Sequence, residues 1–210
     1  MISLATCPRN ISPIIRAADP EEAIFYAGEA CDELIELKSG IVRAVRLSRD
    51  GHRQILSFFC AGDYLGSPAM HIHAFTAEAV TPVRYHRYSK SRWTAQLRQD
   101  GCDDGNLFWA IQRQQELAAY RGLVLGLQGM QVRLCAFFSF IIGGLTQQPD
   151  GTFVVPISQV DIAAYLATNP ACICRALRCL RERRLLTVSR RDGIRLTDPD
   201  GIQHIANIYL

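Results

Sequence analysis

A stretch near the C-terminus constrains the fold of this chain most, because it has the spacing of two short helices joined by a tight turn. Within residues 159–178, apolar residues stand fourth and eighth, at Ile162 and Leu166, and a small residue stands fifth, at Ala163. A β-branched apolar residue, Ile173, stands fifteenth. The small residue lets the two helices approach each other, and the apolar side chains fill the wedge between them. The spacing therefore predicts a helix-turn-helix motif.

Capping residues at both helix starts support this motif. Ser158 followed by Asp161 resembles a capping box, with Asp where Glu or Gln is usual, and predicts a helix from Gln159 to Leu166. Asn169 can cap a second helix, and Pro170 suits its first position. The sequence thus predicts the start of each helix independently of the apolar spacing.

The residues after the second helix predict a wing. The helix itself has a buried face made by Ile173, Leu177 and Leu180. Two short β-like runs follow, Leu185–Val188 and Ile194–Thr197, and Asp192-Gly193 supplies a turn between them. Two helices followed by a hairpin are typical of a winged helix-turn-helix, which places its second helix in the major groove of DNA.

The charge distribution agrees with a nucleic-acid surface. The chain has 21 Arg and only two Lys, and its net charge is only +3. Eight of the Arg lie between Arg175 and Arg195, where the only acids are Glu182 and Asp192, so this stretch of 21 residues carries 8 − 2 = +6. A concentrated basic patch on a globular chain is typical of a surface that contacts the phosphate backbone.

The first half of the chain has the pattern of an antiparallel β-structure. In residues 21–92, apolar and β-branched stretches alternate with turn signals that recur every 10–12 residues or so. Asp50-Gly51 between Ile41–Leu47 and Gln54–Phe59 predicts a hairpin, because Gly supplies the positive φ that a tight turn needs. We expect a barrel or sandwich here.

Between these two parts, good helix formers predict a long helix from Leu107 to Leu127, followed by a second helix, Gln131 to Ile142, that stops at Gly143-Gly144. The first helix has an apolar stripe at helical spacing. We expect this stripe to pair with a second copy of the chain, and the alternative is packing on the chain's own barrel. The residues of the stripe are Ala110, Leu117, Tyr120, Val124 and Leu127.

Taken together, the pattern predicts an α+β chain in three parts. Residues 1–103 form a sensor-like β-roll, 104–145 a dimerisation helix and the helix after it, and 146–210 the winged helix-turn-helix. The longest apolar run, 134–142, is far shorter than the roughly 20 residues that span a bilayer. The N-terminus lacks the apolar core of a signal peptide, and eight irregularly spaced Cys suggest reduced thiols, so we expect a cytoplasmic protein.

With these motifs in place, the chain resembles the CRP/FNR transcription regulators over about residues 20–200. The segments that carry the resemblance are Phe25–Glu29, Ser39-Gly40, Asp50–Ile55, Gly62–Gly66, Ala77–Ala79, Val132–Phe137 and Asp161–Leu166. The Asp-Gly-His-Arg-Gln-Ile and Ala-Glu-Ala segments are most similar to the FixK and NnrR branch. That branch regulates low-oxygen, nitrogen-fixation and denitrification genes.

The resemblance implies a sequence-specific regulator that binds a palindromic site on double-stranded DNA as a homodimer and acts with RNA polymerase. The family uses a Glu and an Arg on the second helix to recognise a cytosine and a guanine in TTGAT…ATCAA. Arg175 matches the Arg, whereas Ala171 stands at the Glu position, so recognition of the central G·C pair is in question. The expected DNA-contacting residues are Ser158, Asn169, Pro170, Ala171, Cys174, Arg175, Arg178, Arg190 and Arg191.

The family's ligand sites are poorly matched. Members that bind cyclic AMP hold its phosphate with an Arg-Ser pair, and Phe75-Thr76 stands there, so we expect no cyclic nucleotide. An iron–sulfur cluster needs four converging thiolates, and no tight Cys group is present, so we expect no cofactor and no metal.

Three alternatives remain open for sensing: haem, thiol oxidation, or no ligand at all. His71, His73 and His86 are the candidates for haem, although we expect His71 and His73 to be solvent-facing or loop residues. Thiol oxidation would use Cys172, Cys174 or Cys179, which flank the Arg-rich helix. No nucleophile with a general base is apparent, which argues against an enzyme. A β-roll binding module without DNA function would not account for the helix-turn-helix.

Overall fold

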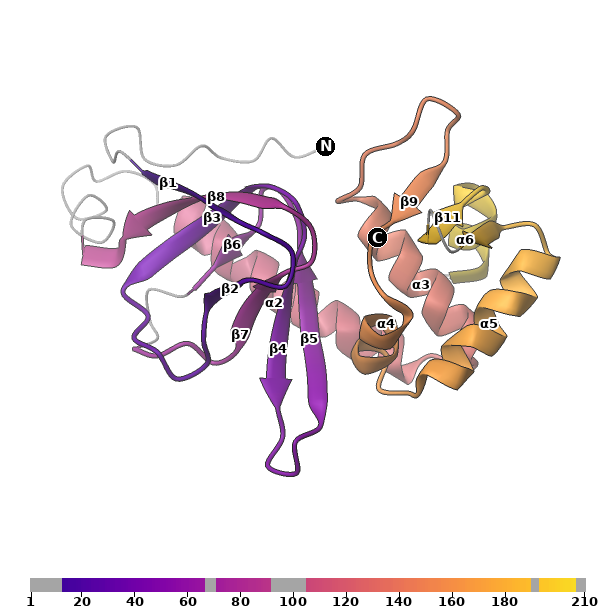
Figure 1. Ribbon diagram of the computed structural model, residues 1–210, viewed down its shortest axis with the longest axis horizontal. Helices are drawn as coiled ribbons and strands as arrows, with labels where there is room; N and C mark the ends of the chain where they lie inside the picture. The colour runs from indigo at the N-terminus through magenta and orange to yellow at the C-terminus, as the bar shows by residue number, and fades with distance from the viewer. Residues whose placement is uncertain (1–12, 67–70, 92–104, 190–192, 207–210) are drawn as a thin grey trace. The chain divides into compact units, whose positions relative to one another are not determined.

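The structure is a computed structural model that describes residues 13–66, 71–91, 105–189 and 193–206, without the side chains of residues 105–111 (Figure 1). The chain divides into two compact units. The first comprises Met1–Arg46 and Leu56–Ala119, and the second comprises Leu47–Ile55 and Tyr120–Leu210. This division differs from the expected three parts, because the long helix is shared between the units and a hairpin of the β-roll sequence groups with the second unit.

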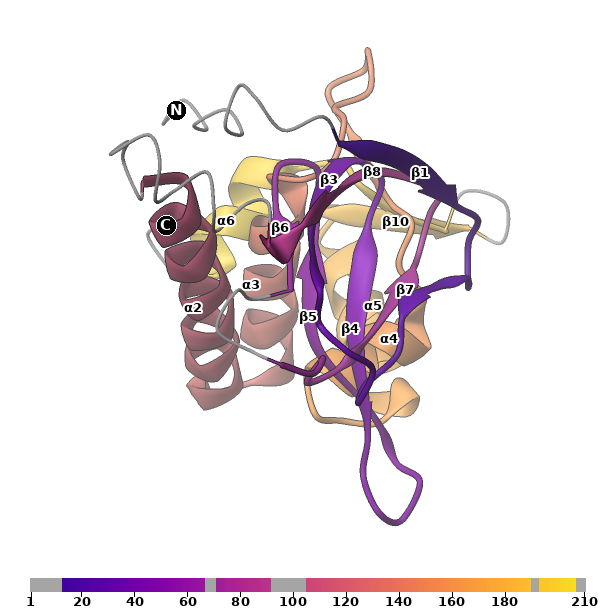
Figure 2. The same cartoon turned by 90° about the vertical axis from the view of Figure 1, so that its left-hand side faces the viewer.

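The first unit is built on two antiparallel sheets that form the expected β-roll (Figure 2). One sheet has the order β1-β8-β3-β6, with β1 Ile14–Ala18, β8 Val83–Ser89, β3 Glu33–Ser39 and β6 Tyr64–Leu65. The other has the order β2-β7-β4-β5, with β2 Ala23–Phe25, β7 Thr76–Ala79, β4 Val42–Leu47 and β5 Arg53–Phe59. Side chains from both sheets, such as Leu37, Val42 and Phe58, are fully buried and make the core.

The predicted hairpin joins β4 to β5. Gly51 has φ +81°, a conformation that a side chain would strain, and its N–H donates to the Ser48 carbonyl at 3.0 Å. The Ser48 N–H donates to the His52 carbonyl at 2.9 Å and closes the turn. The expectation from Asp50-Gly51 is confirmed.

Two consecutive helices follow, as expected: α2, Gly105–Gly126, and α3, Met130–Ile142. Gly129, with φ +88°, stands at the N-cap of α3 and breaks the helical path between them. α3 buries Leu134, Phe137 and Ile141, and it packs against α5, Pro170–Glu182, and the C-terminal helix α6, Pro199–Ala206.

The dimerisation stripe expected on α2 is wrong in two of its residues. Leu117 is 3% exposed and Val124 is fully buried inside a single chain, so neither side chain is available to a second copy. The Tyr120 hydroxyl donates to the Ala136 carbonyl at 2.7 Å, which also ties it to its own chain. Leu127 is half-buried, and the Ala110 side chain lies outside the described residues. The periodicity located the apolar face correctly, but the chain itself covers that face.

The second unit contains the predicted winged helix-turn-helix. The helices α4, Gln159–Tyr165, and α5 pack against each other. The wing is a three-stranded sheet in the order β10-β11-β9, made of β10 Leu186–Ser189, β11 Gly193–Leu196 and β9 Phe153–Val155. Within the described residues no helix is long and apolar enough to cross a membrane.

Candidate nucleic-acid interface

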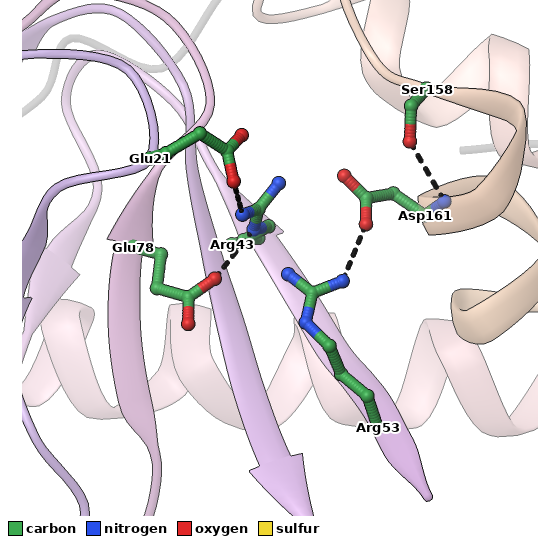
Figure 3. Close-up of polar contacts among 6 residues, drawn as sticks. All are labelled: Glu21, Arg43, Arg53, Glu78, Ser158 and Asp161. Carbon is green, nitrogen blue, oxygen red and sulfur yellow. Dashed lines mark hydrogen bonds and ion pairs between the residues drawn. The ribbon is translucent and has the colours of Figure 1, made fainter.

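The first helix of the motif begins at the predicted cap. The Ser158 hydroxyl accepts a hydrogen bond from the Asp161 N–H at 3.0 Å, which satisfies one of the free amides of the first turn of α4 (Figure 3). The Asp161 carboxylate has a partner outside the helix, because it accepts from the Arg53 guanidinium at 2.6 Å. The Ser158 half of the expected capping box is confirmed, and Asp161 is directed at the hairpin.

The turn between the two helices has the geometry that the motif requires. α4 ends at Tyr165 with Leu166 as its C-cap, and Ala167 has φ +51°, in the left-handed region. The Thr168 N–H then donates to the Ala163 carbonyl at 3.0 Å and closes the turn. Glycine is favoured at this position because a Cβ in this conformation costs roughly 1 kcal/mol, and Ala167 is the smallest residue that carries one.

The second helix also begins as predicted. Asn169 Oδ1 accepts from the Cys172 N–H at 2.9 Å, and Pro170 occupies the first helical position. Ser158 and Asn169, both expected to contact DNA, thus use their side-chain oxygens to cap the two helices. Both residues are exposed at helix N-termini, where the partial positive charge of the backbone faces solvent.

α5 separates an apolar face from a polar one. Its buried residues are Ile173, Ala176, Leu177 and Leu180. Its opposite face exposes Ala171, Cys174, Arg175 and Arg178, as the sequence predicts. The candidate base-contacting residues therefore share the solvent-facing side of one helix, which the wing and α4 hold in place.

The exposed arginines of this face have no acidic partners. Within the part of the chain that the structure describes, no carboxylate lies within ion-pair distance of Arg175, Arg178 or Arg181, and the same holds for Arg183 and Arg184, which follow the end of α5. A hollow of about 210 Å³ opens between α4, α5 and β10, and Arg178 and Arg181 line it. The expected contacts Arg190 and Arg191 lie outside the described residues. The result is a concentration of positive charge that the fold itself does not neutralise.

Two thiols take part in contacts on this face. The Arg175 guanidinium donates to Cys172 Sγ at 3.1 Å, and Cys174 Sγ donates to Gln159 Oε1 at 3.0 Å. Hydrogen bonds from Thr168 and then Arg175 lower the pKa of the Cys172 thiol below its ordinary value, because both stabilise the thiolate. The sequence reasoning missed Gln159, whose link to Cys174 follows only from the way α4 packs on α5.

The β-roll differs from a cyclic-nucleotide pocket at the residues that the sequence singled out. The Phe75 ring centroid lies 5.6 Å from that of Phe25 and 6.0 Å from that of Phe59, so aromatic packing is found where the family has an arginine. The Thr76 hydroxyl accepts from the Ala27 N–H at 3.1 Å. Phe75 and Thr76 themselves are half-buried and carry no charge.

The two neighbouring histidines are not alike. His71 is exposed, but His73 is buried, and its ring stacks on Phe25 at 3.7 Å between centroids. His73 lies in the loop before β7, as one alternative of the expectation has it, but its ring is packed inside the roll and does not face solvent. Among the described residues, no three His, Cys, Asp or Glu side chains are grouped to hold a metal ion. Cys7 and Cys102 lie outside the described residues.

Two protein-family models match the chain. The model of the cyclic nucleotide-binding domain matches residues 15–100, and that of the Crp-like helix-turn-helix domain matches residues 132–205. Together they account for the roll and the winged helix in the order found here. The chain belongs to the CRP/FNR family of transcription regulators.

Known members of this CRP/FNR family are similar along nearly the whole chain. The nitrogen fixation regulation protein FixK of Rhizobium meliloti is 28% identical over 211 residues, covering 97% of this chain and 92% of that protein. The transcriptional activatory protein AadR of Rhodopseudomonas palustris is also 28% identical, covering 89% of this chain and 79% of that protein. The structure of FixK2 from Bradyrhizobium japonicum matches with a TM-score of 0.84 at 22% identity, covering 95% of this chain and all of that one. This last likeness shows the fold.

Proposed function

We propose that this CRP/FNR protein binds a palindromic DNA site as a homodimer, with α5 of each copy in the major groove. The observation that carries the proposal is the exposed face of α5, where Arg175 and Arg178 have no carboxylate of the described residues within ion-pair distance. A charge surplus of this kind is unfavourable in the isolated protein and favourable next to a polyanion. We propose no enzymatic activity, because the related proteins FixK and AadR are named as regulatory and transcriptional activatory proteins.

The residues of the interface divide into base contacts and phosphate contacts. Arg175 is proposed to donate to guanine O6 and N7, and Ala171 to touch a thymine methyl. Arg178, together with Arg190 and Arg191 of the wing, is proposed to contact phosphates. The exposed N-termini capped by Ser158 and Asn169 present helix ends to the backbone of the duplex, with Pro170 and Cys174 at the edge of the contact.

The dimer contact is proposed to use the face of α2 that the chain leaves open. Leu123 is 51% exposed on this helix, and Gly122 and Gly126 beside it are exposed and leave room for a second backbone to approach. Two copies related by a twofold axis would place their α5 helices in major grooves about one helical turn apart, which requires a palindromic site.

The regulated genes are proposed from the relatives. FixK is named as a nitrogen fixation regulation protein and AadR as a transcriptional activatory protein. We propose that this protein acts in the cytoplasm and activates genes for low-oxygen metabolism, nitrogen fixation or denitrification, through a contact with RNA polymerase. Cyclic nucleotides are not proposed as effectors, because Phe75 and Thr76 stand where cyclic-AMP-binding members of the family use an Arg-Ser pair, and neither side chain carries a positive charge to pair with a phosphate.

A thiol-based control of the same regulator is favoured by a specific observation. Cys172 lies at the N-terminus of α5 and contacts Arg175, the proposed guanine-binding residue. An oxidised sulfur at Cys172 would change the position of that guanidinium. Haem sensing has no comparable support, because the ring of His73 is stacked on Phe25.

The experiment that tests the proposal compares three fluorescent duplexes at fixed salt: a TTGAT…ATCAA palindrome, one half-site, and a scrambled sequence of equal length. Binding by anisotropy should be tightest on the palindrome, by about 10³-fold or more over the scrambled duplex. Intermediate binding to the half-site would reflect one docked subunit. Equal affinity for all three duplexes would contradict sequence-specific recognition.

A further inference from the structure

The β4–β5 hairpin contributes a residue to the helix-turn-helix unit. Residues Leu47–Ile55 group with the C-terminal unit rather than with the roll from which they extend. From this hairpin, Arg53 Nη1 lies 2.6 Å from Asp161 Oδ1 on α4 (Figure 3). Because 108 residues separate them in the sequence, this ion pair is a tertiary contact that fixes α4 from outside the helix-turn-helix.

The Asp161 carboxylate is buried at the start of α4, where it depends on its contact with Arg53. The residue is 4% exposed and stands at the third position of α4, where its own N–H is bound by Ser158. A buried carboxylate is stable only with a charged or hydrogen-bonding partner. The Arg53 side chain is about one-third exposed, whereas the Asp161 side chain that it contacts is 5% exposed. Loss of the guanidinium therefore acts on the first turn of α4.

The first turn of α4 is linked in turn to the exposed face of α5. Gln159, the first residue of α4, accepts a hydrogen bond from Cys174 Sγ on that face. Ile162 and Ile173, both fully buried, belong to the apolar wedge between the two helices. A shift or fraying of the α4 N-terminus would thus reach the helix that carries Arg175 by a side-chain contact and by packing.

We propose that Arg53 is a positioning residue for DNA recognition, which holds α4, and through it α5, in the orientation that docks in the major groove. Arg53 acts through Asp161 and contacts no base. This inference rests on the proposed function, because the orientation matters only if α5 binds DNA. It also assigns the hairpin a role in presenting the DNA-binding unit.

The test uses the full-length dimer and four variants: Arg53→Ala, Arg53→Lys, Asp161→Asn and the double variant Arg53→Ala/Asp161→Asn. Arg49→Ala is the matched control, since Arg49 is exposed on the same hairpin. Arg53→Ala should weaken palindrome binding by about tenfold, in the range of coupling found between contacting residues. Arg53→Lys should recover part of the loss, and Arg49→Ala should bind as the wild type does.

Two readouts separate positioning from a direct phosphate contact and from a general loss of stability. The slope of log Kd against log salt should be unchanged in Arg53→Ala, because no phosphate contact is removed. Hydrogen exchange of the DNA-free protein should be faster in the first turn of α4, and as in the wild type in the β-roll. The double variant should lose less DNA-binding free energy than the sum of the losses in the two single variants, because the neutral Asn at position 161 needs no guanidinium.

Three results would overturn the positioning role of Arg53. They are losses of DNA-binding free energy that add up in the double variant, an α4 hydrogen-exchange rate unchanged in Arg53→Ala, or a slope of log Kd against log salt lowered by about one in Arg53→Ala. A wild-type protein that distinguishes the palindrome, together with an Arg53→Ala protein of equal affinity, would contradict this inference alone. A wild-type protein that binds palindrome and scrambled DNA equally would contradict the proposed function and this inference with it.

Discussion

The arginines of the first unit's interior and those on the exposed face of α5 differ in their partners. In the β-roll, Arg43 is 5% exposed and donates to Glu78 at 2.8 Å and also to Glu21 (Figure 3). Arg113 of α2 pairs with Asp63 of the same unit at 3.1 Å. On α5, Arg175 and Arg178 are exposed, and no described carboxylate lies within ion-pair distance of them. The same residue type thus supports the fold inside the first unit and remains exposed on α5.

This difference distinguishes charged side chains that stabilise the fold from charged side chains that are available to a partner. A buried guanidinium needs its carboxylates, so removing either partner destabilises the fold. An exposed one contributes little to stability, and clustered like charges repel. The same contrast applies to the apolar side chains of α2, where Leu117 is covered by its own chain and Leu123 is not. Groups that remain uncovered are the candidates for partner contacts.

The largest effect is expected from Arg43 in the β-roll. Arg43→Leu should lower the free energy of unfolding by about 3–5 kcal/mol, since Glu78 would be left partly buried without its guanidinium. Urea denaturation followed by circular dichroism measures this loss. Arg46→Leu on the exposed part of the same strand is the control and should change stability by about 0.5 kcal/mol or less. Equal losses in the two variants would contradict a structural role for Arg43.

A smaller effect should distinguish the two faces of α2. Leu123→Asp should leave the fold intact and raise the dimer dissociation constant by about 30-fold or more, because a carboxylate would be buried between the copies. Leu117→Asp should instead destabilise each subunit. Sedimentation velocity across a concentration series, combined with thermal melting, follows both properties. A Leu123→Asp protein that stays dimeric at all concentrations would place the interface elsewhere.

Next in size is the loss of one phosphate contact. Arg178→Ala should weaken binding to every duplex several-fold, palindrome and scrambled alike, and lower the slope of log Kd against log salt by about one. Its free energy of unfolding should match that of the wild type, because no ion pair is broken. A selective loss on the palindrome, with the salt slope preserved, would indicate a base contact instead.

The smallest change concerns thiol chemistry. Hydrogen bonds from Thr168 and Arg175 lower the pKa of Cys172, whereas burial raises the pKa of Cys60 and of Cys135 to about 12. A lowered pKa keeps the thiolate present at lower pH, so alkylation of Cys172 should slow less between pH 8 and pH 6 than that of a free thiol. Timed iodoacetamide labelling with peptide mass spectrometry should detect Cys172 well before Cys60 or Cys135. Earlier labelling of either buried thiol would refute this.

Local patterns in the sequence were sufficient for much of the fold and of the interface. Spacing in the sequence predicts the caps Ser158 and Asn169, the tight turn between the two helices and the exposed residues of α5. Each of these features depends on neighbours within about one helical turn. The similarity to FixK was predicted from two short segments, Asp50–Ile55 and Ala77–Ala79.

Contacts between distant segments were not predictable in the same way. The pair Arg53 and Asp161 joins residues 108 apart, and no local signal marks it. Leu117 and Val124 show why the dimer stripe was misassigned, since periodicity identifies an apolar face and does not identify what covers it. The burial of His73 in its loop is of the same kind, because it depends on stacking with Phe25, which is 48 residues away in the sequence.

The central claim, that α5 recognises bases through Arg175, is tested most directly by competitive binding of wild-type and Arg175→Ala proteins to a set of single-base half-site variants at fixed salt. The account predicts that Arg175→Ala loses about 1–3 kcal/mol on the preferred site. It also predicts that the variant no longer discriminates at one base pair in each half-site and keeps its preferences at the others. An equal loss of affinity on every half-site variant would make Arg175 a phosphate contact and contradict the proposed docking of the helix.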